Sequence, residues 1–177
     1  TERTQEILFE LEELIKTGAI PRIPMYVDSP LAIKLTAVYE KHSDEFNKNA
    51  KYIMNTGGDI FKFEGLTMTP AVEESKHIND VPAPKIIIAG SGMSNGGRIL
   101  HHESRYLPDP KSTLLIIGYQ VEGCLGRQLQ RGDKEVTIFG KKVPVNCRVV
   151  TIGGYSAHAD QPALLNWVKE ASQGGKL

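Results

Sequence analysis

Three short apolar segments in this sequence are each followed by a turn or glycine-rich loop and then by a stretch with helical spacing. They occupy residues 23–27, 85–89 and 113–117. The last two show no alternation of polar and apolar residues, which is typical of strands buried on both faces. Amphipathic helical patterns precede the first segment at residues 1–17 and follow it at residues 31–42. This alternation predicts an α/β fold in which one mainly parallel central sheet, flanked by helices, contains all three segments.

The composition is that of one compact globular domain. The chain has 177 residues, of which 40% are hydrophobic, and this is enough for a single core. Its 21 Lys and Arg residues balance 21 Asp and Glu residues. The balance excludes a global basic field, so a nucleic-acid role would have to rest on a local groove.

The cysteine content and the hydropathy of the chain indicate the cellular compartment in which it is expected. Cys124 and Cys147 lack the spacing of a metal site, and such sparse usage predicts a reducing, cytoplasmic setting, although a disulfide between them stays open. No apolar run approaches the length of a membrane span and no signal peptide is visible, so no membrane partner is expected. The chain begins at Thr1 inside a helical pattern, which indicates a segment of a longer protein.

Glycine-rich loops follow two of the apolar segments, at residues 90–93 and 118–123. A strand, a glycine-rich loop and a helix N-terminus form an anion site, because backbone N–H groups point outward and the helix dipole favours negative charge. Ligands of open α/β sheets bind beyond the carboxyl ends of the strands, and Asp28 is expected at that edge with both loops. The loops predict a phosphate-bearing substrate. The alternative, that the glycines only permit tight turns, has equal weight on this pattern.

The first loop matches neither of two specific nucleotide-binding motifs, the dinucleotide fingerprint and the P-loop. Gly90, Gly92 and Gly96 form G-x-G-x-x-x-G, one residue away from the dinucleotide fingerprint. Arg98 and Ile99 stand where a P-loop requires Lys and then Ser or Thr. Both failures argue against a Rossmann-type enzyme that acts on a small nucleotide.

A third turn carries a lone histidine, His158, between an apolar segment at residues 149–152 and a helical pattern at residues 161–171. A strand that delivers one imidazole on a tight turn can present a proton-transfer group at a cleft. On this chemistry, catalysis is favoured slightly over a structural role for His158. Asp160 is as compatible with a helix cap as with a functional acid.

No metal site is predicted within the chain. His101, His102 and Glu103 are adjacent on a predicted helix and point in different directions, so a packing or surface role is expected for them. His158 and Asp160 alone are too few, because a zinc site needs three or four ligands.

The order of several short motifs along nearly the whole chain resembles a known family. The motifs are ERTQE (residues 2–6), VDSPLA (27–32), IAGSGM (88–93), GGRILHH (96–102), GYQVEG (118–123) and YSAHAD (155–160). The pattern resembles the β-CASP family, RNA-processing nucleases of the metallo-β-lactamase superfamily that are similar to the cleavage endonuclease of messenger-RNA 3′-end formation.

The resemblance implies a two-domain enzyme, in which a Rossmann-like β-CASP domain is inserted into a metallo-β-lactamase domain and closes over its active site. Residues 1–150 would form the β-CASP domain, and residues 151–177 the first element of the return to the other domain. Two zinc ions are implied in the full-length enzyme, with ligands in motifs before Thr1 and after Leu177. No zinc is expected in this chain, and Asp28 is not the acid of the family's metal site.

The resemblance also assigns roles to individual residues. Ser156, Ala157 and His158 match the family's motif B, whose histidine faces the scissile phosphate, so His158 is the expected catalytic residue. The residues expected to bind RNA phosphate are Ser91, Gly92, Met93, Ser156 and Ala157. The implied reaction is zinc-assisted hydrolysis of phosphodiester bonds in single-stranded RNA.

The expected partners are single-stranded RNA and the protein's own metallo-β-lactamase domain, with a homodimer left open. The chain on its own is expected to be inactive. The alternative from another class is a non-catalytic module that binds RNA or a protein. Intact zinc motifs in the flanking parent sequence would separate the two hypotheses.

Overall fold

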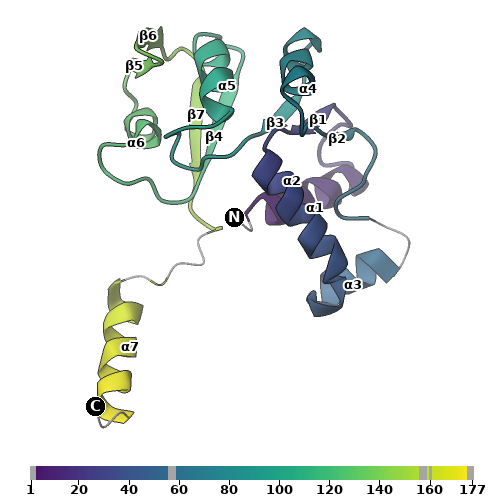
Figure 1. Ribbon diagram of the computed structural model, residues 1–177, viewed down its shortest axis with the longest axis vertical. Coiled ribbons are helices and arrows are strands. Elements are labelled where there is room, and N and C mark those ends of the chain that lie inside the picture. Colours follow the sequence, from purple (N-terminus) through teal and green to yellow (C-terminus); the bar gives the residue numbers. More distant parts are fainter. Residues whose placement is uncertain (1–2, 56–58, 156–158, 160, 175–177) are drawn as a thin grey trace.

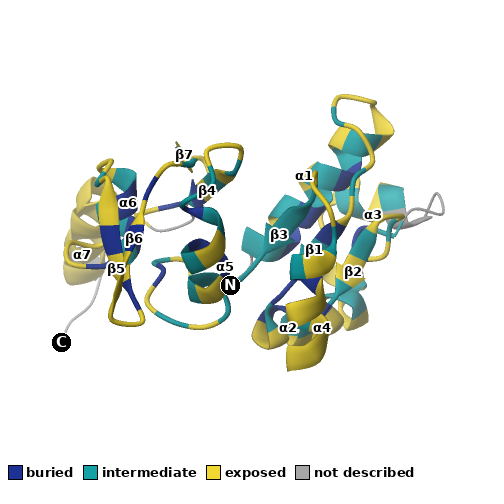
Figure 2. Cartoon of the chain, turned by 90° about the horizontal axis from the view of Figure 1, so that it is seen from above, coloured by how far each residue is buried: buried dark blue, intermediate teal, exposed yellow. Residues whose placement is uncertain are grey.

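The computed structural model describes residues 3–55, 59–155, 159 and 161–174. Figures 1 and 2 show two lobes, and Figure 1 shows a last helix beyond them. The first lobe, residues 3–89, contains α1 (Arg3–Lys16), β1 (Met25–Val27), α2 (Pro30–Lys41), η1 (Ser43–Glu45), α3 (Lys48–Asn55), β2 (Leu66–Met68), α4 (Val72–His77), η2 (Ile78–Asp80) and β3 (Ile86–Ile88). The second lobe, residues 99–152, contains α5 (Ile99–Tyr106), β4 (Thr113–Ile117), α6 (Leu125–Gln130), β5 (Glu135–Ile138), β6 (Lys141–Pro144) and β7 (Arg148–Ile152), and α7 (Gln161–Gly174) follows it.

The first lobe is built on a three-stranded parallel sheet in the order β2-β1-β3. Met25 at the start of β1 pairs with Leu66 of β2 on one side and with Ile86 of β3 on the other. Leu8 from α1 and Val27 from β1 are fully buried in the core of this lobe. The predicted alternation of helices and apolar strands is confirmed here by the order α1, β1, α2. On the apolar side of α1 only Leu8 is fully buried, whereas Leu14 is 39% exposed.

The turn from β1 into α2 follows the local sequence. Ser29 caps α2 through its Oγ, which accepts a hydrogen bond from Ala32 N–H (3.3 Å), and Pro30 occupies the start of the helix. The chain thus passes from β1 through Asp28 and Ser29 directly into α2. This short connection fixes Asp28 at the carboxyl edge of the sheet.

The second lobe combines two pairs of strands. β4 and β7 are parallel, and β5 and β6 form an antiparallel hairpin. The hairpin turns at Phe139 and Gly140, which have positive φ angles of 52° and 73°, and glycine adopts such an angle without strain. Leu107, Leu129 and Val136 are buried in the core of this lobe, which packs α5 and α6 against the strands.

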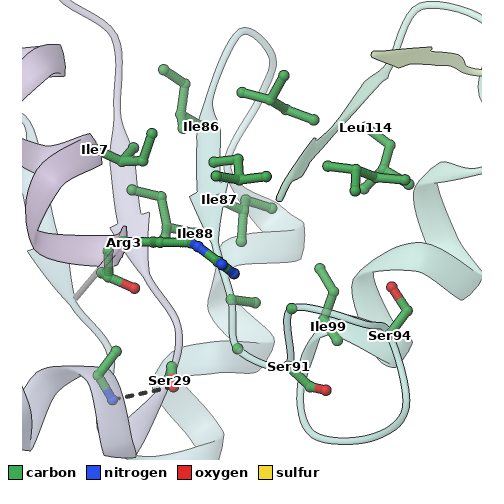
Figure 3. A pocket seen from close by; sticks show the side chains of 18 of the residues that line it. Arg3, Ile7, Ser29, Ile86, Ile87, Ile88, Ser91, Ser94, Ile99 and Leu114 are labelled. Atoms are coloured by element: carbon green, nitrogen blue, oxygen red, sulfur yellow. Dashed lines mark hydrogen bonds between the residues drawn. The ribbon is translucent and has the colours of Figure 1, made fainter. Parts of the chain in front are cut away.

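The prediction of one central sheet is wrong in one respect. β1 and β3 share a sheet as expected, but β4 lies in a second sheet with β7. Both β3 and β4 line a cavity of about 540 Å³, and Figure 3 shows Ile86, Ile87 and Ile88 on one strand and Leu114 on the other. Side chains of α1 and α2, including Ile7, also line this cavity. An unbroken apolar strand indicates that both its faces are covered, but it does not specify which strand lies beside it.

The helix predicted after residue 160 is present as α7, and Figure 1 shows it apart from both lobes. Its apolar side is exposed to between 54% and 68% at Leu164, Leu165, Trp167 and Val168. None of the helices in the described part of the chain combines the length and the hydropathy that crossing a bilayer requires. The return of this segment toward another domain stays a prediction.

Candidate functional site

The glycine loop, defined as residues 90–97, joins β3 to α5 at the carboxyl end of the first sheet. Asp28 lies at the same edge, because its backbone N–H donates to Ile88 O at the end of β3 (2.8 Å). Ser91, Gly92 and Ser94 line the cavity between the two sheets, and Figure 3 shows Ser91 and Ser94 on the loop. The predicted placement of Asp28 and this loop at one edge is confirmed.

The glycines of this loop have two different roles. Gly97 has a φ of +74°, and a Cβ there would lie 3.2 Å from Gly90 O, so Gly97 is required by the turn. Gly92 is exposed, and a Cβ at Gly92 would meet no heavy atom within 4 Å. Gly97 thus serves the turn, whereas Gly92 leaves its backbone uncovered, and the phosphate-binding role of the loop stays a prediction.

The second glycine loop, residues 118–123, holds the first one in place. Buried Gln120 donates from Nε2 to Gly92 O (2.8 Å), and Gly126 N–H donates to Met93 O (3.1 Å). A Cβ at Gly126 would lie 1.9 Å from Gln120 Oε1, so only glycine permits this approach. Gln120 is a supporting residue that the sequence analysis missed, and a polar side chain inside a glycine-rich loop is the signal that could have found it.

These contacts orient the backbone of the glycine loop. In a planar trans peptide the N–H points away from the C=O, so Met93 N–H points away from Gln120, which binds Gly92 O. Among the described residues, no acceptor bonds Met93 N–H. The next donor, Ser94 N–H, is used inside the turn by Ser91 O (3.0 Å). The loop thus offers an open backbone donor beside an exposed glycine.

Glu103 on α5 holds the loop through Ser94, whose Oγ donates to Glu103 Oε1 (2.5 Å). Glu103 is only 3% exposed, and within the described residues its Oε2 has no hydrogen-bond partner. Burial raises the pKa of Glu103 to about 7, although the hydrogen bond from Ser94 opposes the rise. The carboxyl group is therefore largely neutral below pH 7, which reduces the cost of the unpaired oxygen.

The two adjacent histidines of α5 point in different directions, as the helical spacing predicts. His102 is buried, whereas His101 is exposed and its ring centroid lies 4.7 Å from that of Phe139. Across the described ranges, no group of three or more His, Cys, Asp or Glu residues could hold a metal ion. The residues present in these ranges therefore do not fit a zinc site.

A buried cluster around Asp28 was not predicted. Asp28 has 0% exposure and accepts four side-chain hydrogen bonds, from Thr69 (2.9 Å), Ser75 (2.6 Å), Arg98 (2.6 Å) and His102 (2.7 Å). Burial alone raises the pKa of Asp28, but these hydrogen bonds outweigh burial and the pKa is lowered. The carboxylate is therefore ionised at neutral pH, and His102 presents Nε2–H to it. The sequence signal was the spacing of Arg98 and His102, four residues apart on one helical face.

The predicted site residues fall into two groups. Ser91, Gly92 and Met93 lie together on the glycine loop. The residues of the His158 turn lie outside the described residues, namely Ser156, Ala157, His158 and Asp160. Just before them, Tyr155 O accepts a hydrogen bond from Arg3 Nε (3.3 Å), and Arg3 lines the same cavity as the loop.

Glu103→Gln is expected to flatten the pH dependence of stability. The pKa of Glu103 is about 7 in the folded chain and near the ordinary value of 4.5 in the unfolded chain, so folding takes up a proton between these pH values. Glu103 therefore makes its full contribution to the free energy of unfolding below about pH 4.5. Roughly 3 kcal/mol of that free energy is lost as the pH rises from about 4.5 to about 7. Urea unfolding at a series of pH values measures the difference, with Glu6→Gln on the exposed face of α1 as the control. Parallel pH profiles for the wild-type chain and Glu103→Gln would contradict this account.

Comparisons with known proteins agree with the motifs. The family described as the Beta-Casp domain matches residues 4–129, and the Zn-dependent metallo-hydrolase RNA specificity domain matches residues 142–174. A ribonuclease of Thermus thermophilus is 39% identical over 95% of this chain and 38% of its own length. The transcription termination factor FttA of Methanosarcina mazei is 34% identical (94% and 27%), and an RNase J-like protein of Methanocaldococcus jannaschii is 37% identical (95% and 38%).

The chain thus spans between 27% and 38% of the length of these three relatives. The Beta-Casp match covers most of its residues, including both glycine loops and the Asp28 cluster. The chain belongs to the β-CASP family of metallo-β-lactamase nucleases, as its motifs predicted.

Proposed function

We propose that this chain is the RNA-binding, active-site-closing part of a zinc-dependent ribonuclease that hydrolyses phosphodiester bonds in single-stranded RNA. The observation that carries the proposal is Met93 N–H, a backbone donor with no acceptor among the described residues, on a loop held by Gln120 and Gly126. Relatives that are named as ribonucleases support the substrate class.

RNA would be bound by its phosphates rather than by its bases. The chain has equal numbers of acidic and basic residues, so backbone donors rather than a broad basic surface would hold the phosphates. The open backbone at Gly92 lets a phosphate oxygen approach Met93 N–H without a side chain between them. Contacts of this kind position a strand without reading its sequence, which suits a nuclease that acts on many single-stranded RNAs.

His158 is proposed to donate a proton to the leaving oxygen of the RNA, with Ser156 and Ala157 at the same phosphate. The support is the match of these residues to the family's motif B and their place after β7. The chain reaches this turn beside Arg3, which lines the cavity that the glycine loop also lines.

The zinc ions of the proposed nuclease would be held elsewhere in the parent protein. The family that matches residues 142–174 is described as Zn-dependent, but the described residues of this chain contain no group that could hold a metal. Two zinc ions are proposed in the metallo-β-lactamase domain, and the chain alone is proposed to be inactive.

We also propose that α7 packs against that metallo-β-lactamase domain. Four large apolar side chains of α7 are more than half exposed, namely Leu164, Leu165, Trp167 and Val168, and a cluster of this kind marks a contact surface. The alternative is that this apolar face of α7 packs against a second copy of the chain. The cytoplasm is the proposed setting, because Cys124 and Cys147 are both free thiols.

Gly92→Val should weaken RNA binding while the fold is kept. A Cβ at residue 92 would meet no heavy atom within 4 Å, and the valine side chain would cover the approach to Met93 N–H. We expect the Kd for a fluorescent oligouridine to rise about tenfold, the effect of one lost hydrogen bond to a charged group. Thr137→Val, on an exposed position of β5, is the control. An unchanged Kd for Gly92→Val at matched salt would remove the loop from the RNA site.

His158→Ala, made in the full-length parent, should lower the turnover rate by about 10²–10⁴-fold, because the leaving oxygen loses its proton donor. Zinc content should stay at the wild-type level, since His158 is not proposed as a ligand. His101→Ala is the control, because His101 is exposed on α5 and contacts Phe139 only at the surface. Loss of zinc together with activity would instead make His158 a metal ligand. A wild-type rate with full zinc would favour the alternative that the chain is a non-catalytic binding module.

A further inference from the structure

We infer that Arg98, held by the buried carboxylate of Asp28, is the residue that positions the glycine loop for RNA, and this inference rests on the proposed function. Arg98 directly follows the loop and precedes α5. It is therefore the point at which the end of the loop next to α5 can be fixed to the first lobe.

The guanidinium group of Arg98 forms its hydrogen bonds with acceptors of the protein itself. Its Nη1 donates to Asp28 Oδ1 (2.6 Å) and to Thr69 O (2.5 Å), and its Nη2 donates to Pro70 O (2.8 Å). Only 16% of the side chain is exposed. All three acceptors belong to the first lobe, at the end of β1 and just after β2. Arg98 thus acts through the position of the loop rather than as a phosphate ligand.

The other part of the glycine loop is fixed to the second lobe. Gly92 O and Met93 O accept hydrogen bonds from Gln120 Nε2 and Gly126 N–H. Arg98 is the complementary attachment, so the loop bridges the two lobes. The direction of Met93 N–H depends on both attachments, because each one sets an end of the same short segment.

The surroundings of Asp28 favour an arginine at residue 98. An ionised carboxylate with 0% exposure needs a cation beside it, and Arg98 forms the ion pair at 2.6 Å. The other carboxylate oxygen, Oδ2, accepts hydrogen bonds from His102 Nε2 (2.7 Å) and Ser75 Oγ (2.6 Å). A lysine at residue 98 would keep the charge, but one ammonium group cannot donate in the planar fork that reaches three acceptors on separate segments.

Ser75 supplies a matched control. Ser75→Ala removes a hydrogen bond to the same carboxylate, but Ser75 belongs to α4 and is separated from the glycine loop in sequence by η2 and β3. A purely structural role of the Asp28 cluster predicts that Arg98→Lys and Ser75→Ala weaken RNA binding only as far as each one unfolds the chain. A positioning role predicts that Arg98→Lys weakens binding while the chain is still folded.

The test measures three quantities on the whole 177-residue chain: the melting temperature, the Kd for a fluorescent oligouridine, and the hydrogen exchange of the loop amides. Binding is measured at a temperature at which both variants are folded. Arg98→Lys is expected to raise the Kd by about tenfold, equivalent to one lost hydrogen bond to a phosphate. It should also speed exchange across residues 91–97. Ser75→Ala should leave the Kd within about twofold of wild type and the loop amides protected.

Two outcomes would overturn the inference. One is a wild-type Kd for folded Arg98→Lys while Gly92→Val weakens binding, which removes the positioning role and leaves the RNA site standing. The other is an equal rise of the Kd in folded Arg98→Lys and folded Ser75→Ala, which assigns the positioning of the loop to the whole Asp28 cluster rather than to Arg98. If Gly92→Val and Arg98→Lys both bind RNA as wild type does, the proposed RNA site itself is wrong.

Discussion

The buried carboxylate of Asp28 is the constraint on which the carboxyl edge of the first sheet depends. An ionised group without contact to water is unfavourable unless donors fill its lone pairs. Thr69, Ser75, Arg98 and His102 supply those donors from the end of β2, from α4 and from both sides of the start of α5. The cluster therefore fixes where three segments lie relative to β1. Removal of one donor leaves a lone pair of the buried carboxylate without a hydrogen bond, which is unfavourable.

The glycine loop gains its geometry from this edge and from the second lobe together. Gln120 Nε2 and Gly126 N–H donate hydrogen bonds to the carbonyl oxygens of Gly92 and Met93, and the trans peptide then directs Met93 N–H away from Gln120. A donor that is oriented before the ligand arrives loses little entropy on binding. In the proposed function, this preorganisation would let a chain with no net charge bind a polyanion at one place.

The sequence predicted local structure better than it predicted contacts between distant segments. The apolar strands β1, β3 and β4 and the cap at Ser29 follow from spacing and residue type, which act over a few neighbours. The pairing of β4 with β7 rather than with β3 depends on packing around the cavity, which no local pattern encodes. The role of Asp28 depends on Arg98 and His102, which lie about 70 residues further along the chain, so no local pattern indicates it.

The central claim is that the backbone of the glycine loop, at Met93, binds RNA phosphate. The most direct measurement is the NMR titration of the isotopically labelled chain with a short single-stranded oligouridine at matched salt. The account predicts that the amide signals of Ser91, Gly92 and Met93 shift together and saturate at one RNA concentration, while those of the β5–β6 hairpin stay in place. Shifts confined to the exposed lysines of that hairpin, Lys141 and Lys142, with the loop amides unchanged, would contradict it.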